Sequence, residues 1–192
     1  MKARPLLLLF LLSACAGLPP PKGADHRYAG RFSLAVTRAA PAGEAPQRDA
    51  WTGRFTLQVD ARSLTLDLVS PLGSTIARFE TDPQEARLLV PSGGGVRVEH
   101  GPDARVLSEQ VLGWSLPVTG MVDWVEGRPS PARPYLPLAT SGDVARFEQD
   151  GWSVTVEPPA EGRPGRRLQL DRDSQDGAPA VALRVVLDGP AS

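Results

Sequence analysis

The chain carries, at residues 55–73, the stretch FTLQVDARSLTLDLVSPLG, in which two runs of alternating apolar and polar residues are joined by a short link. Alternation with a period of two is typical of a β-strand that buries one face. The link over 60–62 is too short for a parallel crossover, so we expect the two strands to pair antiparallel. Residues 70–73, Ser-Pro-Leu-Gly, then suit a type I turn into a further strand.

The same alternation recurs along most of the chain and predicts about ten strands. Short turns that contain Gly, Asp or Ser separate them, which favours antiparallel connections. The chain also has 20 prolines, and these oppose long helices because each removes a backbone donor. We therefore expect a mainly β protein with one sheet that is apolar on one face. The expected strands cover 32–37, 54–59, 63–68, 74–81, 86–91, 96–100, 143–149, 152–157, 166–171 and 180–187.

Two central segments depart from this alternation and predict short helices. Asp103 can cap a helix that runs to about residue 112 and ends at Gly113. A second helix is expected over 119–126, followed by Gly127. Apolar residues recur at helical spacing in both segments, so their apolar sides are expected to pack on the apolar face of the sheet.

The first residues have the pattern of an export signal. Lys2 and Arg4 precede an apolar run over 6–12, which is much shorter than the roughly 20 residues of a membrane-spanning helix. The run ends in Leu-Ser-Ala-Cys at 12–15, which resembles a bacterial lipobox, and Cys15 is the only cysteine of the chain. The alternative is an ordinary signal peptide with a stray cysteine.

The lipobox interpretation predicts that the chain has three parts. Residues 1–14 are a lipoprotein signal peptide that is removed before Cys15, which then carries the acyl anchor. Residues 15–27 hold the lipidated cysteine and a tether with three consecutive prolines, which favour an extended, stiff chain. Residues 28–192 form a single domain.

Composition and motifs argue against several functional classes. The formal net charge is −1, and no basic block interleaves with aromatic residues, so no nucleic-acid partner is expected. Residues 113–117 only approach the G-x-S-x-G pattern of serine hydrolases, and the chain has two histidines. The acidic stretch 171–177 lacks the spacing of a calcium loop. We therefore expect no catalytic residues, no metal site and no cofactor.

Four elements in sequence order resemble the LolB family of outer-membrane lipoprotein receptors. They are the lipobox at Cys15, the strand pair leading into 70–75, the stretch 116–129, and Gln-Asp-Gly-Trp at 149–152. The resemblance implies an unclosed antiparallel β-barrel of ten or eleven strands, with short helices as a lid over an apolar cavity. It implies a non-enzymatic monomer on the periplasmic side of the outer membrane, which accepts acylated lipoproteins from the carrier LolA and inserts them among the outer-membrane lipids.

Leu72 is the first candidate functional residue. A Ser-Pro-Leu-Gly turn has no structural need for leucine at its third position. The matching loop of the family carries a protruding apolar residue, so Pro71, Leu72 and Gly73 are predicted to form a membrane-insertion loop. The alternative is that Leu72 is one of the single exposed leucines common on protein surfaces, or that it folds back onto the barrel rim.

Nine apolar residues are candidates for the lining of the acyl cavity, although plain core packing explains the strand leucines and Trp124 as well. Two other functions stay open: a carrier of another lipid, and a structural or assembly lipoprotein of the outer membrane with a filled core. The nine residues are Phe55, Leu57, Leu64, Leu66, Leu68, Val122, Trp124, Val125 and Trp152.

Overall fold

The computed structural model describes residues 25–139, 142–162, 165–175 and 177–189. The predicted signal peptide and Cys15 lie outside the described residues. Within them the chain forms eleven strands and two short helices, and neither helix is long and apolar enough to cross a membrane. In chain order the elements are β1 (His26–Arg38), β2 (Gln47–Val59), β3 (Leu64–Val69), β4 (Thr75–Thr81), β5 (Ala86–Ser92), β6 (Gly95–Gly101), α1 (Ala104–Leu112), α2 (Val118–Trp124), β7 (Leu136–Pro137), β8 (Ala145–Gln149), β9 (Trp152–Glu157), β10 (Arg167–Arg172) and β11 (Ala180–Leu187).

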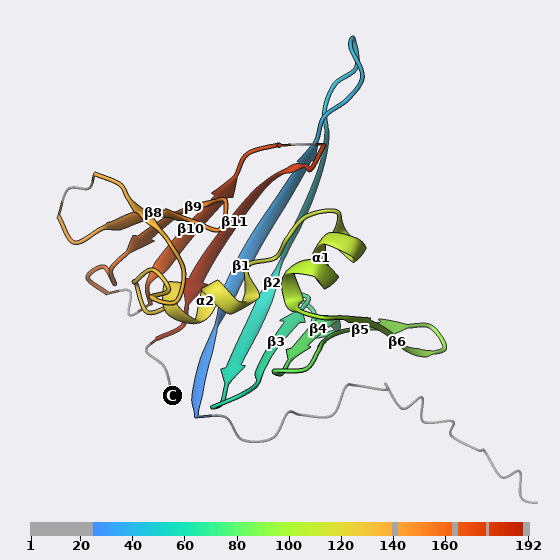
Figure 1. Ribbon diagram of the computed structural model, residues 1–192, viewed down its shortest axis with the longest axis horizontal. Helices are drawn as coiled ribbons and strands as arrows, with labels where there is room; N and C mark the ends of the chain where they lie inside the picture. The colour runs from blue at the N-terminus through green and yellow to red at the C-terminus, as the bar shows by residue number, and fades with distance from the viewer. Residues whose placement is uncertain (1–24, 140–141, 163–164, 176, 190–192) are drawn as a thin grey trace, which may run out of the picture.

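All eleven strands belong to one antiparallel sheet, in the order β6-β5-β4-β3-β2-β1-β11-β10-β9-β8-β7. The first strand pairs with the last in the middle of the sheet, and β6 and β7 are left as two unpaired edges. The helical segment connects these edges, and Figure 1 shows both helices on the same side of the curved sheet. The predicted mainly β fold, with an unclosed antiparallel sheet and two short helices, is confirmed.

Helix α1 begins and ends where the sequence predicts. The carboxylate of Asp103 accepts a hydrogen bond from the backbone N–H of Val106 (2.8 Å), and Gly113 follows the helix in the left-handed conformation. Leu107 packs directly on Gly101 of β6, where a Cβ atom would lie 2.8 Å from the Cβ of Leu107. The glycine therefore lets α1 lie close against the edge of the sheet.

Helix α2 differs from its prediction by a residue at its start and two at its end. It begins at Val118, directly after Pro117, and ends at Trp124. A tight turn follows, in which the N–H of Gly127 donates to the carbonyl of Trp124 (2.9 Å) and Gly127 has φ +90°. Apolar spacing continues into this turn, which explains why the prediction is too long.

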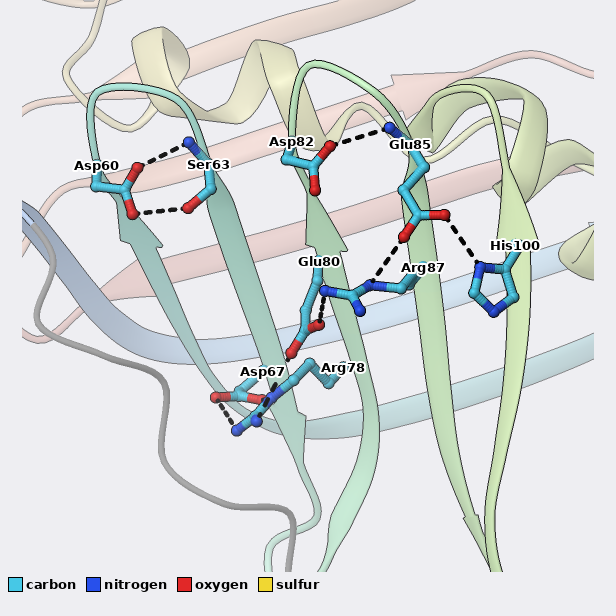
Figure 2. A network of polar contacts seen from close by, with 9 residues as sticks. All are labelled: Asp60, Ser63, Asp67, Arg78, Glu80, Asp82, Glu85, Arg87 and His100. Atoms are coloured by element: carbon cyan, nitrogen blue, oxygen red, sulfur yellow. Dashed lines mark hydrogen bonds and ion pairs between the residues drawn. The ribbon is translucent and has the colours of Figure 1, made fainter.

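The two faces of the sheet have opposite character, as the alternation predicts. The face that the helices cover carries the hydrophobic core. The other face of β3 to β6 carries ion pairs between residues directly opposite each other on neighbouring strands (Figure 2). Arg78 donates twice to the carboxylate of Asp67 (2.5 and 3.0 Å), and Arg87 lies 3.0 Å from Glu80. These pairs fix which face points away from the core.

Most predicted strands differ from the structure by one or two residues at an end, and β1 and β2 differ by more. Strands β1 and β2 extend beyond their apolar repeats, and β1 includes His26 and Arg27, which were assigned to the tether. Strand β7 was missed, because its two residues are held by pairing with β8 and are too short to show alternation.

Candidate functional site

The hairpin between β3 and β4 is held by hydrogen bonds at its base. The N–H of Gly73 donates to the carbonyl of Ser70 (3.0 Å), and the N–H of Ser70 donates to the carbonyl of Ser74 (2.8 Å). The hydroxyl of Ser70 also accepts from the N–H of Ser74 (3.1 Å). Gly73 has φ +90°, which glycine adopts without strain. This arrangement is that of a three-residue loop in which a type I turn is followed by a left-handed glycine.

Leu72 lies at the tip of this loop with 96% of its surface exposed. It therefore projects into solvent and does not fold back onto the rim of the barrel. Pro71 fixes φ before it and Gly73 completes the turn after it, so the loop presents the leucine on a stiff support. Such exposure costs about 1.5–3 kcal/mol relative to burial of the same side chain, and local structure does not require it.

A small apolar pocket lies between the centre of the sheet and the helical segment. Its volume is about 40 Å³, little more than the roughly 30 Å³ that one water molecule occupies in the liquid. Every lining residue is apolar, which suits part of a hydrocarbon chain but no polar ligand. The lining residues are Phe32, Leu34, Phe55, Leu66, Leu68, Leu116, Met121, Leu183 and Val185.

The structure divides the nine predicted cavity residues into two groups. Phe55, Leu66 and Leu68 line the pocket, and all three lie in the stretch 55–73. The other six pack in or against the core away from the pocket lining, and Val122 is the one that is only partly buried. These six are Leu57, Leu64, Val122, Trp124, Val125 and Trp152.

Six pocket residues were missed. Leu34 pairs with Trp51 on one side and with Leu183 on the other, so the pocket spans the junction between the first and last strands. Alternation placed these residues on the apolar face but contains no signal that β1 and β11 are neighbours. Leu116 and Met121 face the pocket from the helical segment. The six are Phe32, Leu34, Leu116, Met121, Leu183 and Val185.

Two phenylalanines form the floor of the pocket by lying over glycines on the neighbouring strand. Gly30 pairs with Phe55, and Phe32 pairs with Gly53, across β1 and β2. A Cβ atom on Gly53 would lie 2.9 Å from the ring of Phe32, and one on Gly30 would lie 2.8 Å from the ring of Phe55. Because these two glycines have no side chain, the rings of Phe32 and Phe55 can lie directly against the neighbouring strand.

The far end of α2 is held to β8 by the buried side chain of Gln149. Its oxygen accepts from the indole N–H of Trp124 (2.8 Å) and from the backbone N–H of Ser130 (2.9 Å), and its amide nitrogen donates to the carbonyls of Ser130 (2.9 Å) and Arg133 (3.1 Å). Edge-to-face contacts of Trp124 with Phe147 and of Trp114 with Trp152 add packing on the same side. The motif at 149–152 thus joins the helical segment to β8 and β9.

A polar contact holds the residues after α2 to the first strand. The hydroxyl of Tyr28 donates to the carboxylate of Glu126 (2.6 Å), which also accepts from Arg128. Burial and this hydrogen bond raise the pKa of Tyr28 to about 12, and the same bond lowers the pKa of Glu126. The contact connects a neutral tyrosine to a charged glutamate and so holds this segment against β1.

Larger hollows on the surface have a different chemistry. One of about 500 Å³ beside β7 to β9 is lined by four carboxylates together with polar and a few apolar residues, and one of about 670 Å³ over β1, β10 and β11 is lined partly by three arginines. Neither suits a hydrocarbon chain, so the small apolar pocket is the candidate acyl site despite its size.

Comparison with known proteins agrees with the family resemblance of the sequence. The family described as "Outer membrane lipoprotein LolB" matches residues 25–189. The chain is similar to proteins named Outer-membrane lipoprotein LolB from Bordetella pertussis, with 38% identity over 96% of this chain and 90% of the relative, and from Cupriavidus pinatubonensis, with 35% identity over 93% of this chain and 88% of the relative. A third such protein, from Cupriavidus metallidurans, is 32% identical over 98% of this chain and 97% of its own length. The chain therefore belongs to the LolB family of outer-membrane lipoproteins.

Proposed function

We propose that this chain is an outer-membrane lipoprotein that accepts acylated lipoproteins from the periplasmic carrier LolA and inserts them into the outer membrane. Leu72 is the observation that carries the proposal, because its side chain is 96% exposed at the tip of the hairpin, where the matching loop of the family carries a protruding apolar residue. Family membership and the apolar pocket on the covered face of the sheet support it. No chemical step is required, and none of the proposed roles is that of an enzyme.

Transfer is driven by differences in affinity for the acyl chains. Each buried CH₂ contributes about 0.8 kcal/mol, so an acylated protein does not leave an apolar site for water at a useful rate. A receptor therefore has to bind the chains better than the carrier does, and the bilayer has to bind them better still. The small pocket has to enlarge during uptake, and the helical segment is the part of its lining that does not belong to the sheet.

Leu72→Glu is expected to block insertion while leaving uptake intact, because it places a charge on the contacting tip without touching the core. The measurement is transfer of an acylated lipoprotein from LolA to phospholipid vesicles by the chain starting at Ala16, which keeps all eleven strands and both helices. The native form is expected to deliver its cargo, and the variant is expected to keep it. Loss of the folded far-UV spectrum, or delivery as fast as the native form, would contradict the role of Leu72.

Gln84→Glu is the matched control. Gln84 is exposed in the turn between β4 and β5, at the opposite end of the strands from Leu72, and the substitution adds the same charge. It is expected to deliver cargo at the native rate.

The size of the pocket favours one alternative, an assembly or scaffolding lipoprotein with a filled core. The same experiment separates the two functions. A well-folded native chain that takes up no acylated cargo would favour the scaffold.

A further inference from the structure

The exposed large apolar side chains of the described residues are unevenly distributed along the strands. The turns of an antiparallel meander alternate between two ends of the sheet, and the β1–β2, β3–β4 and β5–β6 turns share one end. We call this the Leu72 end. By the same alternation the β8–β9 turn lies at this end, beside Tyr135 and Leu136. The exposed large apolar residues of the described chain lie on or toward this end, and none lies in the β2–β3 or β4–β5 turn. They are Trp51, Leu72, Ile76, Val96, Val98, Tyr135 and Leu136.

The opposite end has polar turns. In the β2–β3 turn, the carboxylate of Asp60 accepts from the backbone N–H and the hydroxyl of Ser63 (2.8 and 2.6 Å). In the β4–β5 turn, Asp82 accepts from the N–H groups of Gln84 (2.8 Å) and Glu85 (3.0 Å). Figure 2 shows both turns side by side. These hydrogen bonds lower the pKa of both aspartates and so favour their charged form.

Trp51 connects the Leu72 end with the interior. It is 43% exposed, whereas the other three tryptophans are buried. Its position in β2 is on the covered face, in the same alternating row as Gly53 and Phe55, and it pairs with Leu34, which lines the pocket. Strand β3 ends at Val69, opposite Arg54, so no third strand covers Trp51 on that side.

Continuing the β2–β3 register past Val69 places the loop with Leu72 at the level of Trp51. Ile76, the extra residue at an irregularity of β4, lies on the same hairpin. Leu34 and Leu68 are the partly buried members of the pocket lining, Trp51 and Ile76 are more exposed, and Leu72 is exposed almost completely. Apolar side chains of increasing exposure thus lie between the level of the pocket and the tip of the hairpin.

We propose that a lipid bilayer contacts the Leu72 end over Trp51, Leu72 and Ile76, and that Trp51 marks the mouth of the pocket at the bilayer boundary. An acyl chain then passes from pocket to bilayer without crossing water. Tryptophan suits this place because its ring is apolar and its N–H can stay hydrated. The inference rests on the proposed function and adds where the cargo leaves.

Fluorescence quenching by vesicles of brominated phosphatidylcholine tests the contact, using the chain that starts at Ala16. These vesicles are expected to quench the exposed tryptophan of the native chain and to shift its emission to shorter wavelength. Trp51→Phe is expected to lose most of this quenching and still float with the vesicles. Quenching of the Phe variant equal to that of the native chain would overturn the proposal.

A control moves the reporter to the other end. In the Trp51→Phe background, Gln84→Trp places a tryptophan in the polar β4–β5 turn and is expected to show no added quenching. Equal quenching at both positions would also overturn the proposal. The inference about Trp51 fails, and the proposed function stands, if the chain delivers cargo and floats with vesicles but Trp51 is not quenched. Both fail if cargo is not delivered and the chain does not float.

Discussion

Tyr28 shows how a single hydroxyl connects the sheet to the segment that covers it. Its ring is buried at the start of the first strand, and its O–H reaches the carboxylate of Glu126, 98 residues along the chain. The arrangement requires a neutral phenol and a charged carboxylate together. The pKa of Tyr28 is raised, which favours the neutral phenol, and the pKa of Glu126 is lowered, which favours the charged carboxylate.

Tyr28→Phe is therefore expected to reduce stability in a pH-dependent way. The hydrogen bond to a charged group contributes about 1.5–3 kcal/mol. Because the pKa of Tyr28 rises from 10.0 to about 12 on folding, its contribution is complete below pH 10 and is lost as the pH rises toward 12. The lowered pKa of Glu126 means that its contribution is present above its ordinary value of 4.5 and is lost as the pH falls.

The free energy of unfolding of the native chain and the variant, measured by urea denaturation from pH 4 to 11, checks this expectation. The difference should be constant through the middle of the range and should shrink at both ends. Tyr135→Phe serves as the control, because Tyr135 is 51% exposed. A difference that does not change with pH would show that lost packing, rather than the hydrogen bond, explains the effect.

Helix α2 has only seven residues, and its position depends on partners outside it. Gln149 satisfies the indole N–H of Trp124 and both polar backbone groups of Ser130. Since this glutamine is 2% exposed, water cannot replace it without a change in packing. The helix is thus positioned by one polar side chain of β8 within an otherwise apolar contact.

Gln149→Leu is expected to cost about 1–3 kcal/mol for each buried donor left unpaired, which are the indole of Trp124 and the N–H of Ser130. Thermal unfolding measures the loss, and hydrogen exchange should locate it in α2 and the residues that follow. In a Trp124→Phe background the same substitution should cost less, because one donor is gone. Gln47→Leu, at an exposed position of β2, should change stability by less than about 0.5 kcal/mol.

The strands and helices could be predicted where the residues that determine them are close together in the sequence. Alternation found ten of the strands, and Asp103 with Gly113 marked both ends of α1. The exposure of Leu72 was predictable because it stands at the apex of a tight turn. The pocket was predictable only in part: Phe55, Leu66 and Leu68 lie in one local stretch, but Leu34 and Leu183 meet through the pairing of the first and last strands. That pairing, and the place where Met121 contacts the sheet, depend on contacts between distant parts of the chain.

At the scale of the whole molecule, the sheet is open between β6 and β7, and the helical segment spans the opening. The core is continuous from the helices to both halves of the sheet. Because the pocket lies at the junction of the first and last strands, it is surrounded by the best-paired part of the sheet, and its floor is formed by rings seated on Gly30 and Gly53. Enlargement therefore has to come from the side of the helical segment.

The direction of β1 places a geometric limit on an anchored molecule. Strand β1 starts at His26, at the end opposite Leu72, and Leu34, the partner of Trp51, is eight residues farther along, about 27 Å away. If Cys15 holds the lipid and the strands stand upright on the membrane, the chain between Cys15 and His26 has to run back along this length. Eleven residues reach at most about 36–40 Å, which leaves about 10 Å to spare.

The length of the tether therefore decides whether Leu72 can reach the bilayer in which Cys15 is anchored. Deleting residues 19–23 shortens its greatest reach to about 20–22 Å. The lipidated protein with this deletion should fail to deliver cargo to its own membrane, whereas the same deletion without the lipid should deliver to vesicles normally. Replacing the five residues with a Gly-Ser linker of equal length should preserve delivery. Undiminished delivery by the shortened, lipidated form would mean that the molecule lies on its side, with its strands along the membrane plane.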